Sequence, residues 1–159
     1  MRLLWTTFWG KLLMTFLISM VPIIELRGAL PIATAHGLDW QIAIPVAIIG
    51  NLIPIPFIIV FIKRIFAWIR KVFPKLNSFV DKLENRAKEK SDIIEKGVFW
   101  GLFLFVAIPL PGTGAWTGAL IAAMLDMKLK RAFPAIALGV VTAGIIVAFV
   151  SYGAAALFF

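Results

Sequence analysis

Residues 22–31 read PIIELRGALP and interrupt an apolar stretch that runs from Lys11 to Ala35. Proline lacks a backbone N–H and glycine favours turns, so a continuous helix through this segment is not expected. Backbone that is broken at membrane depth is tolerated only where protein or a water-filled cavity covers it. The segment therefore predicts a re-entrant hairpin, in which two half-helices meet at a tip.

The composition is that of an integral membrane protein. Of the 159 residues, 62% are hydrophobic and 15% are charged, and the mean hydropathy is +0.99. A soluble domain of this length would present a larger polar surface. The chain has no cysteine and a single histidine, His36, which excludes disulfides and clusters of several histidines around a metal. We interpret His36, near a loop, as a residue without a catalytic role, and expect no Ser/His/Asp triad. We therefore expect no enzyme, no catalytic residue, no metal site and no cofactor.

A second interrupted stretch runs from Gly97 to Leu125, where residues 109–118 read PLPGTGAWTG. It predicts a second re-entrant hairpin for the same reason as the first. Two further stretches, Trp40 to Ile62 and Ala132 to Phe159, carry no charge and predict transmembrane helices. At ~1.5 Å per residue each can cross ~30 Å of hydrocarbon. Three prolines predict kinks in the first of them: Pro45, Pro54 and Pro56.

The two halves of the chain resemble each other. PVAIIG at residues 45–50 matches PAIALG at 134–139, and GAL at 28–30 matches GAL at 118–120. A repeat of one hairpin and one span crosses the membrane once, so consecutive repeats are inverted, as in secondary transporters. The predicted fold is a single all-α membrane domain, residues 1–159, with these parts: repeat 1 at about 11–62, a basic amphipathic connector at 63–96, and repeat 2 at about 97–155.

Basic residues are concentrated in the connector. Ten of the sixteen Lys and Arg residues lie between Lys63 and Lys96, and three more follow at 128–131. Clusters of this kind flank apolar spans on the cytoplasmic side, so the net charge of +8 predicts a cytoplasmic connector and no nucleic-acid partner.

Glu25 and Arg27 are the only ionisable residues deep inside an apolar stretch. A charge there costs at least ~2.5–3.5 kcal/mol and usually marks a cavity or a partner. One interpretation assigns Arg27 to an anionic substrate group and Glu25 to a coupled proton. The alternative is that Glu25 pairs with Arg27 or with backbone and only pins the tip.

The second tip is rich in backbone donors. Gly112, Thr113 and Gly114 precede a helix start, whose free N–H groups and dipole favour anions. Trp116 adds a flat surface and Thr117 a hydroxyl. These residues, with Glu25, Arg27 and Gly28, form the predicted substrate site. The alternative is that the glycines only permit close packing. Structural roles are predicted for the following residues: Pro22, Pro31, Asn51 (through a helix–helix hydrogen bond), Pro109, Pro111 and Gly118.

Three motifs carry a resemblance to a known family: IELRGALP at 24–31, Gly50-Asn51, and PLPGTGAWTGAL at 109–120. The chain resembles the "putative small multi-drug export protein" family, which is distantly related to the DedA/VTT membrane proteins. The similarity covers about residues 11–155. It implies two re-entrant hairpins in an inverted repeat, a multi-pass protein of a prokaryotic cytoplasmic membrane, and a link to translocation of undecaprenyl phosphate or other lipids.

The leading hypothesis is a transporter or flippase of an amphipathic, anionic substrate such as a polyprenyl-phosphate carrier lipid, coupled to protons through Glu25. One alternative is a proton-coupled exporter of hydrophobic cationic drugs. Another is a structural or assembly protein whose connector docks partners. The expected partners are membrane lipid and protons, and the pairs Gly97/Gly101 and Gly114/Gly118 permit a homodimer.

Overall fold

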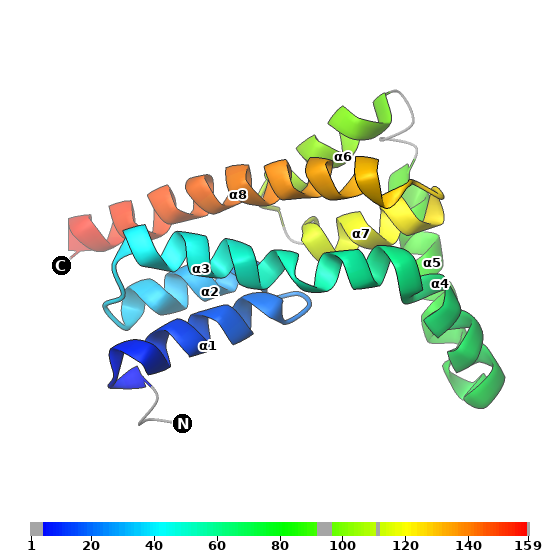
Figure 1. Ribbon diagram of the computed structural model, residues 1–159, viewed down its shortest axis with the longest axis horizontal. Helices are drawn as coiled ribbons and strands as arrows, with labels where there is room; N and C mark the ends of the chain where they lie inside the picture. The colour runs from blue at the N-terminus through cyan, green and yellow to red at the C-terminus, as the bar shows by residue number, and fades with distance from the viewer. Residues whose placement is uncertain (1–4, 92–96, 111, 159) are drawn as a thin grey trace.

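The computed structural model describes residues 5–91, 97–110 and 112–158, and in this part of the chain its regular structure is helical, without strands (Figure 1). The α-helices follow one another in this order: α1 Phe8–Met20, α2 Glu25–Ala35, α3 Trp40–Leu52, α4 Pro54–Val72, α5 Asn77–Ser91, α6 Val98–Ala107, α7 Ala115–Met124 and α8 Leu129–Phe158.

The first hairpin consists of α1 and α2, and its break is shorter than predicted. Only residues 21–24 separate the two helices. Gly28 and Pro31 lie inside α2, so the prediction of an interruption through residue 31 is wrong. A proline inside a helix removes one hydrogen bond and bends the axis, and here the helix continues past it. Glu25 and Arg27 are therefore held in the first turn of α2.

Helices α3 and α4 form one long rod with a break at Ile53, directly before Pro54, where a kink was predicted. The prediction that the helix ends at Ile62 is wrong, because it runs on to Val72. Phe66 keeps the apolar face buried, while Lys63 and Arg64 lie on the exposed side. The change in polarity at residue 63 therefore marks a change of surroundings and not a helix end.

The second hairpin consists of α6 and α7, joined by residues 108–114, of which Pro111 lies outside the described residues. After it, α8 begins three residues before the predicted start and contains Pro134. Two stretches, Trp40–Val72 and Leu129–Ala154, are long and apolar enough to cross a membrane. The arms α1, α6 and α7 are shorter apolar helices. The predicted division into two long spans and shorter broken segments is confirmed.

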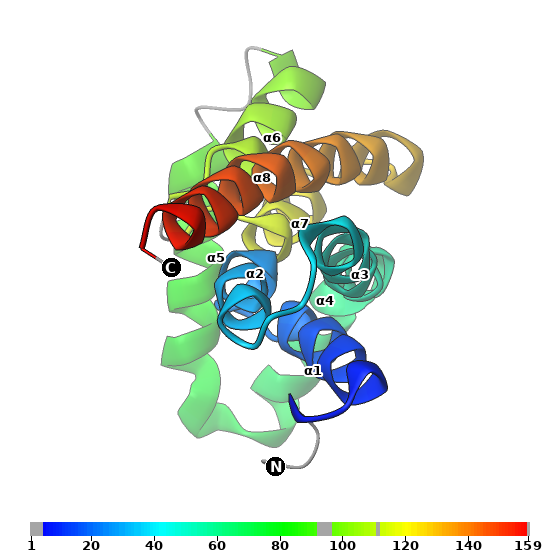
Figure 2. The same cartoon turned by 90° about the vertical axis from the view of Figure 1, so that its left-hand side faces the viewer.

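The two hairpins open at opposite ends of the long axis, and their tips approach each other near the middle of the molecule (Figure 1). Each inner arm packs on the long helix of the other half: α2 on α8, and α7 on α4. Figure 2 looks along this axis and places α2 and α7 in the interior, with α1 and α5 outside. Small side chains line much of the core and let the helices approach closely, among them Ala29, Ala47, Ala119 and Ala135.

The two long helices contact the outer arms of their own halves in the same way. A Cβ added at Gly50 of α3 would lie 2.6 Å from the Phe16 carbonyl oxygen of α1. A Cβ at Gly139 of α8 would lie 2.9 Å from the Phe103 carbonyl oxygen of α6. Both distances are shorter than side-chain contacts allow. These glycines end the matching PVAIIG and PAIALG segments.

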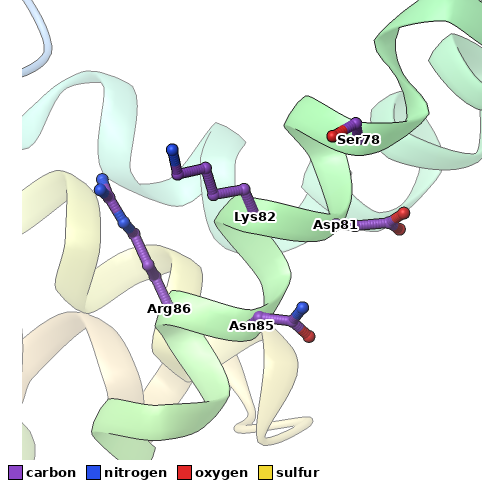
Figure 3. Close-up of a pocket in the computed structure, with 5 residues that line it drawn as sticks. All are labelled: Ser78, Asp81, Lys82, Asn85 and Arg86. Carbon is purple, nitrogen blue, oxygen red and sulfur yellow. The ribbon is translucent and has the colours of Figure 1, made fainter.

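The connector folds back along the bundle after a 3-10 turn at Pro74–Leu76. Arg70 of α4 pairs with Asp81 and Glu84 of α5, at 2.7 and 2.8 Å, and buried Val80 faces inward as α5 packs on α7. A shallow polar hollow lies along the outside of α5 (Figure 3). Its lining comes from one helix: Ser78, Asp81, Lys82, Asn85 and Arg86. No residue of either hairpin tip contributes to it.

Candidate functional site

The Glu25 carboxylate lies on the N-terminus of α7. It accepts hydrogen bonds from the backbone N–H groups of Trp116 at 3.0 Å and Ala115 at 3.3 Å. Glu25 is 5% exposed, and α7 has no side-chain cap of its own at Gly114. The first N–H groups of a helix lack internal partners, and the helix dipole there favours a negative charge. The first hairpin therefore supplies the cap of a helix in the second.

The Arg27 guanidinium lies on the other side of the same break, at the C-terminal end of α6. It donates to the carbonyl oxygens of Val106 at 3.3 Å and Ile108 at 3.2 Å, and to those of Leu110 and Thr113. The Thr113 hydroxyl accepts a further bond at 3.1 Å. The last carbonyls of a helix lack partners, and arginine has five donors in a planar fork. Arg27 thus gives a charged donor to the carbonyls that follow α6, of which those of Ile108 and Leu110 also accept backbone N–H bonds within the loop.

We call this arrangement the crossed caps. Glu25 accepts hydrogen bonds from the first N–H groups of α7, and Arg27 donates hydrogen bonds to the carbonyls at and after the end of α6. Each hydrogen bond to a charged group contributes about 1.5–3 kcal/mol. Among the described residues, no ion pair of 4.0 Å or less joins Glu25 to Arg27. Both charges contact the backbone of the second hairpin instead. This geometry matches the pinning interpretation, and it leaves substrate and proton binding by these residues as predictions.

Gly114 is where the carboxylate approaches the second tip most closely. A Cβ at this position would lie 2.3 Å from the Glu25 Oε2 atom. On the other side of the contact, Glu25 and Ile23 both have left-handed backbone, with φ of 51° and 78°. Such conformations cost about 1–3 kcal/mol each and concentrate at functional sites. Ile23 is also 97% exposed. The first tip is therefore strained where it meets the second.

Two further polar groups at the site make no hydrogen bond of standard geometry in the described part of the chain. Asn51 of α3 is fully buried and interacts with the Glu25 carboxylate, but neither its amide oxygen nor its amide nitrogen reaches standard hydrogen-bond geometry. The indole N–H of Trp116 is buried and unpaired as well. The predicted helix–helix hydrogen bond of Asn51 stays a prediction, with Glu25 of α2 as the neighbouring group. A buried polar group without a well-formed hydrogen bond costs about 1–3 kcal/mol, so both groups are placed to bind a further partner.

The structure thus brings together six residues of the two tips and α3: Glu25, Arg27, Asn51, Thr113, Gly114 and Trp116. Thr113 also donates within its loop, to the carbonyls of Ile108 and Leu110. The remaining predicted residues have other positions. Gly28 packs on Ile24, Gly112 is exposed, and Thr117 lies half-buried in the first turn of α7.

The predicted structural residues flank these contacts. Pro22 and Pro109 are exposed in the two breaks. Gly118 is buried, and a Cβ there would lie 2.7 Å from Val106, so it sets the packing of α7 on α6. The pair Gly114/Gly118 is therefore used inside the chain. A homodimer stays a prediction.

The sequence analysis did not predict which groups accept the hydrogen bonds of Arg27. They are backbone carbonyls of Val106, Ile108 and Leu110, and side-chain identity carries no signal for them. Only the general rule that helix ends leave carbonyls free indicates that a broken helix needs a donor. In the residues that the structure describes, no group of three or more His, Cys, Asp or Glu side chains could hold a metal ion.

The fold and the site define a class: a helical membrane protein in which two interrupted segments meet and the first supplies charged caps to the second. The chain belongs to the "putative small multi-drug export protein" family, whose sequence model matches residues 25–146. The resemblance is thereby confirmed, and the match includes the crossed caps. The family description is that of an export protein rather than an enzyme. No match was found among curated proteins or among solved structures.

Proposed function

We propose that the protein is a secondary transporter of an amphipathic, anionic substrate such as a polyprenyl-phosphate carrier lipid, with a proton coupled through Glu25. One observation carries the proposal. The N-terminus of α7 already holds a carboxylate, that of Glu25. The chain's own side chain therefore stands where an anionic substrate group would bind.

The architecture behind this proposal is an inverted repeat with two re-entrant hairpins. It is supported by the equivalent packing of Gly50 on α1 and Gly139 on α6, and by the opposite directions from which the hairpins enter (Figure 1). In transporters of this kind, half-helix N-termini bind anionic substrate groups near the bilayer midplane. The basic connector lies at the cytoplasmic side in this arrangement.

Exchange between Glu25 and substrate follows from the contacts. Protonation removes the negative charge of Glu25 and weakens its bonds to Ala115 and Trp116. The released N–H groups, the indole N–H of Trp116 and the amide of Asn51 are then donors for the substrate oxygens. Arg27 stays beside them as the compensating positive charge. Since the anion replaces a neutralised Glu25, proton and substrate are bound together and move in the same direction.

A second candidate is proton-coupled export of hydrophobic cations, which the family description favours. Here the drug would pair with the ionised Glu25. Drug and proton would bind in alternation, so they would move in opposite directions. The Arg27 guanidinium, two residues away, repels a cation and makes this candidate the weaker one.

Reconstitution into liposomes tests the proposal. A fluorescent isoprenyl monophosphate is followed between leaflets under an imposed pH gradient. We expect faster translocation in the direction of proton flow. The rate should lose its pH dependence in Glu25→Gln and should fall by about ten-fold or more in Arg27→Ala.

Lys63→Gln is the control, because Lys63 makes an exposed ion pair with Asp126 outside the site. Arg27→Lys is measured beside Arg27→Ala, since it keeps the charge and loses the fork. Anion translocation that is unchanged in Arg27→Ala rejects the proposal. Transport of a hydrophobic cation against the proton flow selects the second candidate.

A further inference from the structure

An apolar groove lies between α3 and α8, at the end of the molecule opposite α5. Its volume is about 360 Å³, within the ~300–1,000 Å³ of ligand pockets. The lining comes from Trp40 and Ile44 of α3 and from Ile145, Phe149, Tyr152 and Gly153 of α8. The Tyr152 hydroxyl donates to the Leu38 carbonyl oxygen at 2.7 Å, so it is turned to the protein. The groove therefore offers hydrocarbon contact alone.

The groove and the crossed caps lie close together along α3, and packed side chains separate them. Its inner end is closed where α8 meets α3: a Cβ at Gly144 would lie 3.4 Å from Ile48 and 4.0 Å from Leu26. Leu26 stands between Glu25 and Arg27 in the chain. Along α3, Asn51 follows Ile44 by about two helical turns, or roughly 10 Å. Groove and polar site are thus neighbours along one helix.

We infer that this groove holds the hydrocarbon chain of the same amphipathic substrate whose anionic head replaces Glu25. The inference rests on the proposed function and adds a second half to its site. The contact of Gly144 with Ile48 and Leu26 separates the groove from Glu25, so a substrate with its chain in the groove places its head at α7 only when α8 moves away from these two residues. Trp40, at the start of α3, sits where aromatic residues favour the membrane–water interface.

A second copy of this chain fits the groove less well. Phe149 is 82% exposed and Trp40 is 54% exposed, so large side chains rim the groove. Close helix–helix contacts in membranes require small residues at the point of approach. The rim would hold a partner helix away from the floor, whereas a flexible chain passes between the rim residues.

Photolabelling locates the chain. The probe is an isoprenyl monophosphate with a diazirine at the chain end, irradiated with the full-length protein in liposomes. We expect labels on residues 40–44 and 145–153. A Cβ at Gly153 meets nothing within 4 Å, so Gly153→Leu adds a side chain to the groove at a position with open space. Gly97→Leu is the matched control, because Gly97 is equally open and lies outside the groove.

In Gly153→Leu we expect labelling and translocation of the probe to fall about ten-fold, with both unchanged in Gly97→Leu. Three results would overturn the inference: labels elsewhere, equal labelling by the uncharged isoprenyl alcohol, or cross-links between two copies through α8. A different result would contradict the proposed function. If Arg27→Ala and Glu25→Gln translocate the probe as the unmodified protein does, the head site is wrong even where the groove is labelled.

Discussion

The two hairpin tips differ in what they offer each other. The first carries both charges, Glu25 and Arg27, and the strained backbone of Ile23. The described part of the second tip carries no charge and presents backbone N–H groups to Glu25 on one side and backbone carbonyls to Arg27 on the other. Neither tip is satisfied alone. The charged side chains of one half are therefore hydrogen-bonded to the backbone of the other. This contact is a specific polar interaction between the two halves.

The largest loss of stability is expected when Arg27, the charged residue with the most hydrogen-bond partners at the tips, is replaced. Arg27→Ala removes the charged donor that joins the first tip to the carbonyls after α6, and we expect a loss of about 2–4 kcal/mol in unfolding free energy. Thermal unfolding in detergent, or unfolding in a denaturing detergent titration, measures it. A melting temperature equal to that of the unmodified protein would mean that the second tip does not depend on the first.

Gly114→Ala tests the close approach from the other side. The added methyl meets the Glu25 carboxylate at 2.3 Å, so we expect a loss of about 1–3 kcal/mol. The φ of 154° at Gly114 disfavours a side chain whatever stands at position 25. A double-mutant cycle with Glu25→Ala removes that shared contribution and isolates the contact. Additive losses would show that the carboxylate and Gly114 do not meet.

Asn51→Leu separates stability from function. The substitution removes an amide that makes no hydrogen bond of standard geometry and keeps the branching at Cγ, so stability should change by less than about 1 kcal/mol. Translocation should fall, because the substrate loses a donor. The pair of measurements is decisive: a large loss of stability with normal translocation would assign Asn51 to packing.

Lys63→Gln gives the smallest effect. The ion pair with Asp126 spans 2.6 Å, but its side chains are 45% and 84% exposed. Exposed pairs contribute about 0–1 kcal/mol and are screened by salt. We expect a change of at most a few tenths of a kcal/mol in thermal unfolding, and none at high salt. A loss comparable to that of Arg27→Ala would place the important contact at the connector and not at the tips.

Much of the arrangement is legible in the sequence. Uncharged length predicts the two long helices, and proline and glycine predict both breaks. The cost of burying a charge singles out Glu25 and Arg27. The partners of these charges were not predictable, because they are backbone atoms brought near by tertiary packing. The extent of α4 was misjudged, since Lys63 and Arg64 sit on the exposed side of a helix that continues to Val72.

The glycine contacts at Gly50 and Gly139 have a mechanical consequence. With no room for even a methyl group, α3 cannot slide along α1, nor α8 along α6, without collision. These contacts hold each long helix in register with the outer arm of its own half, so a relative movement of the halves would have to occur where they meet, at the contacts of α2 and α3 with α8 and of α7 with α4. Glu25 and Arg27 join the same two halves, and the proton proposed for Glu25 would act at that join.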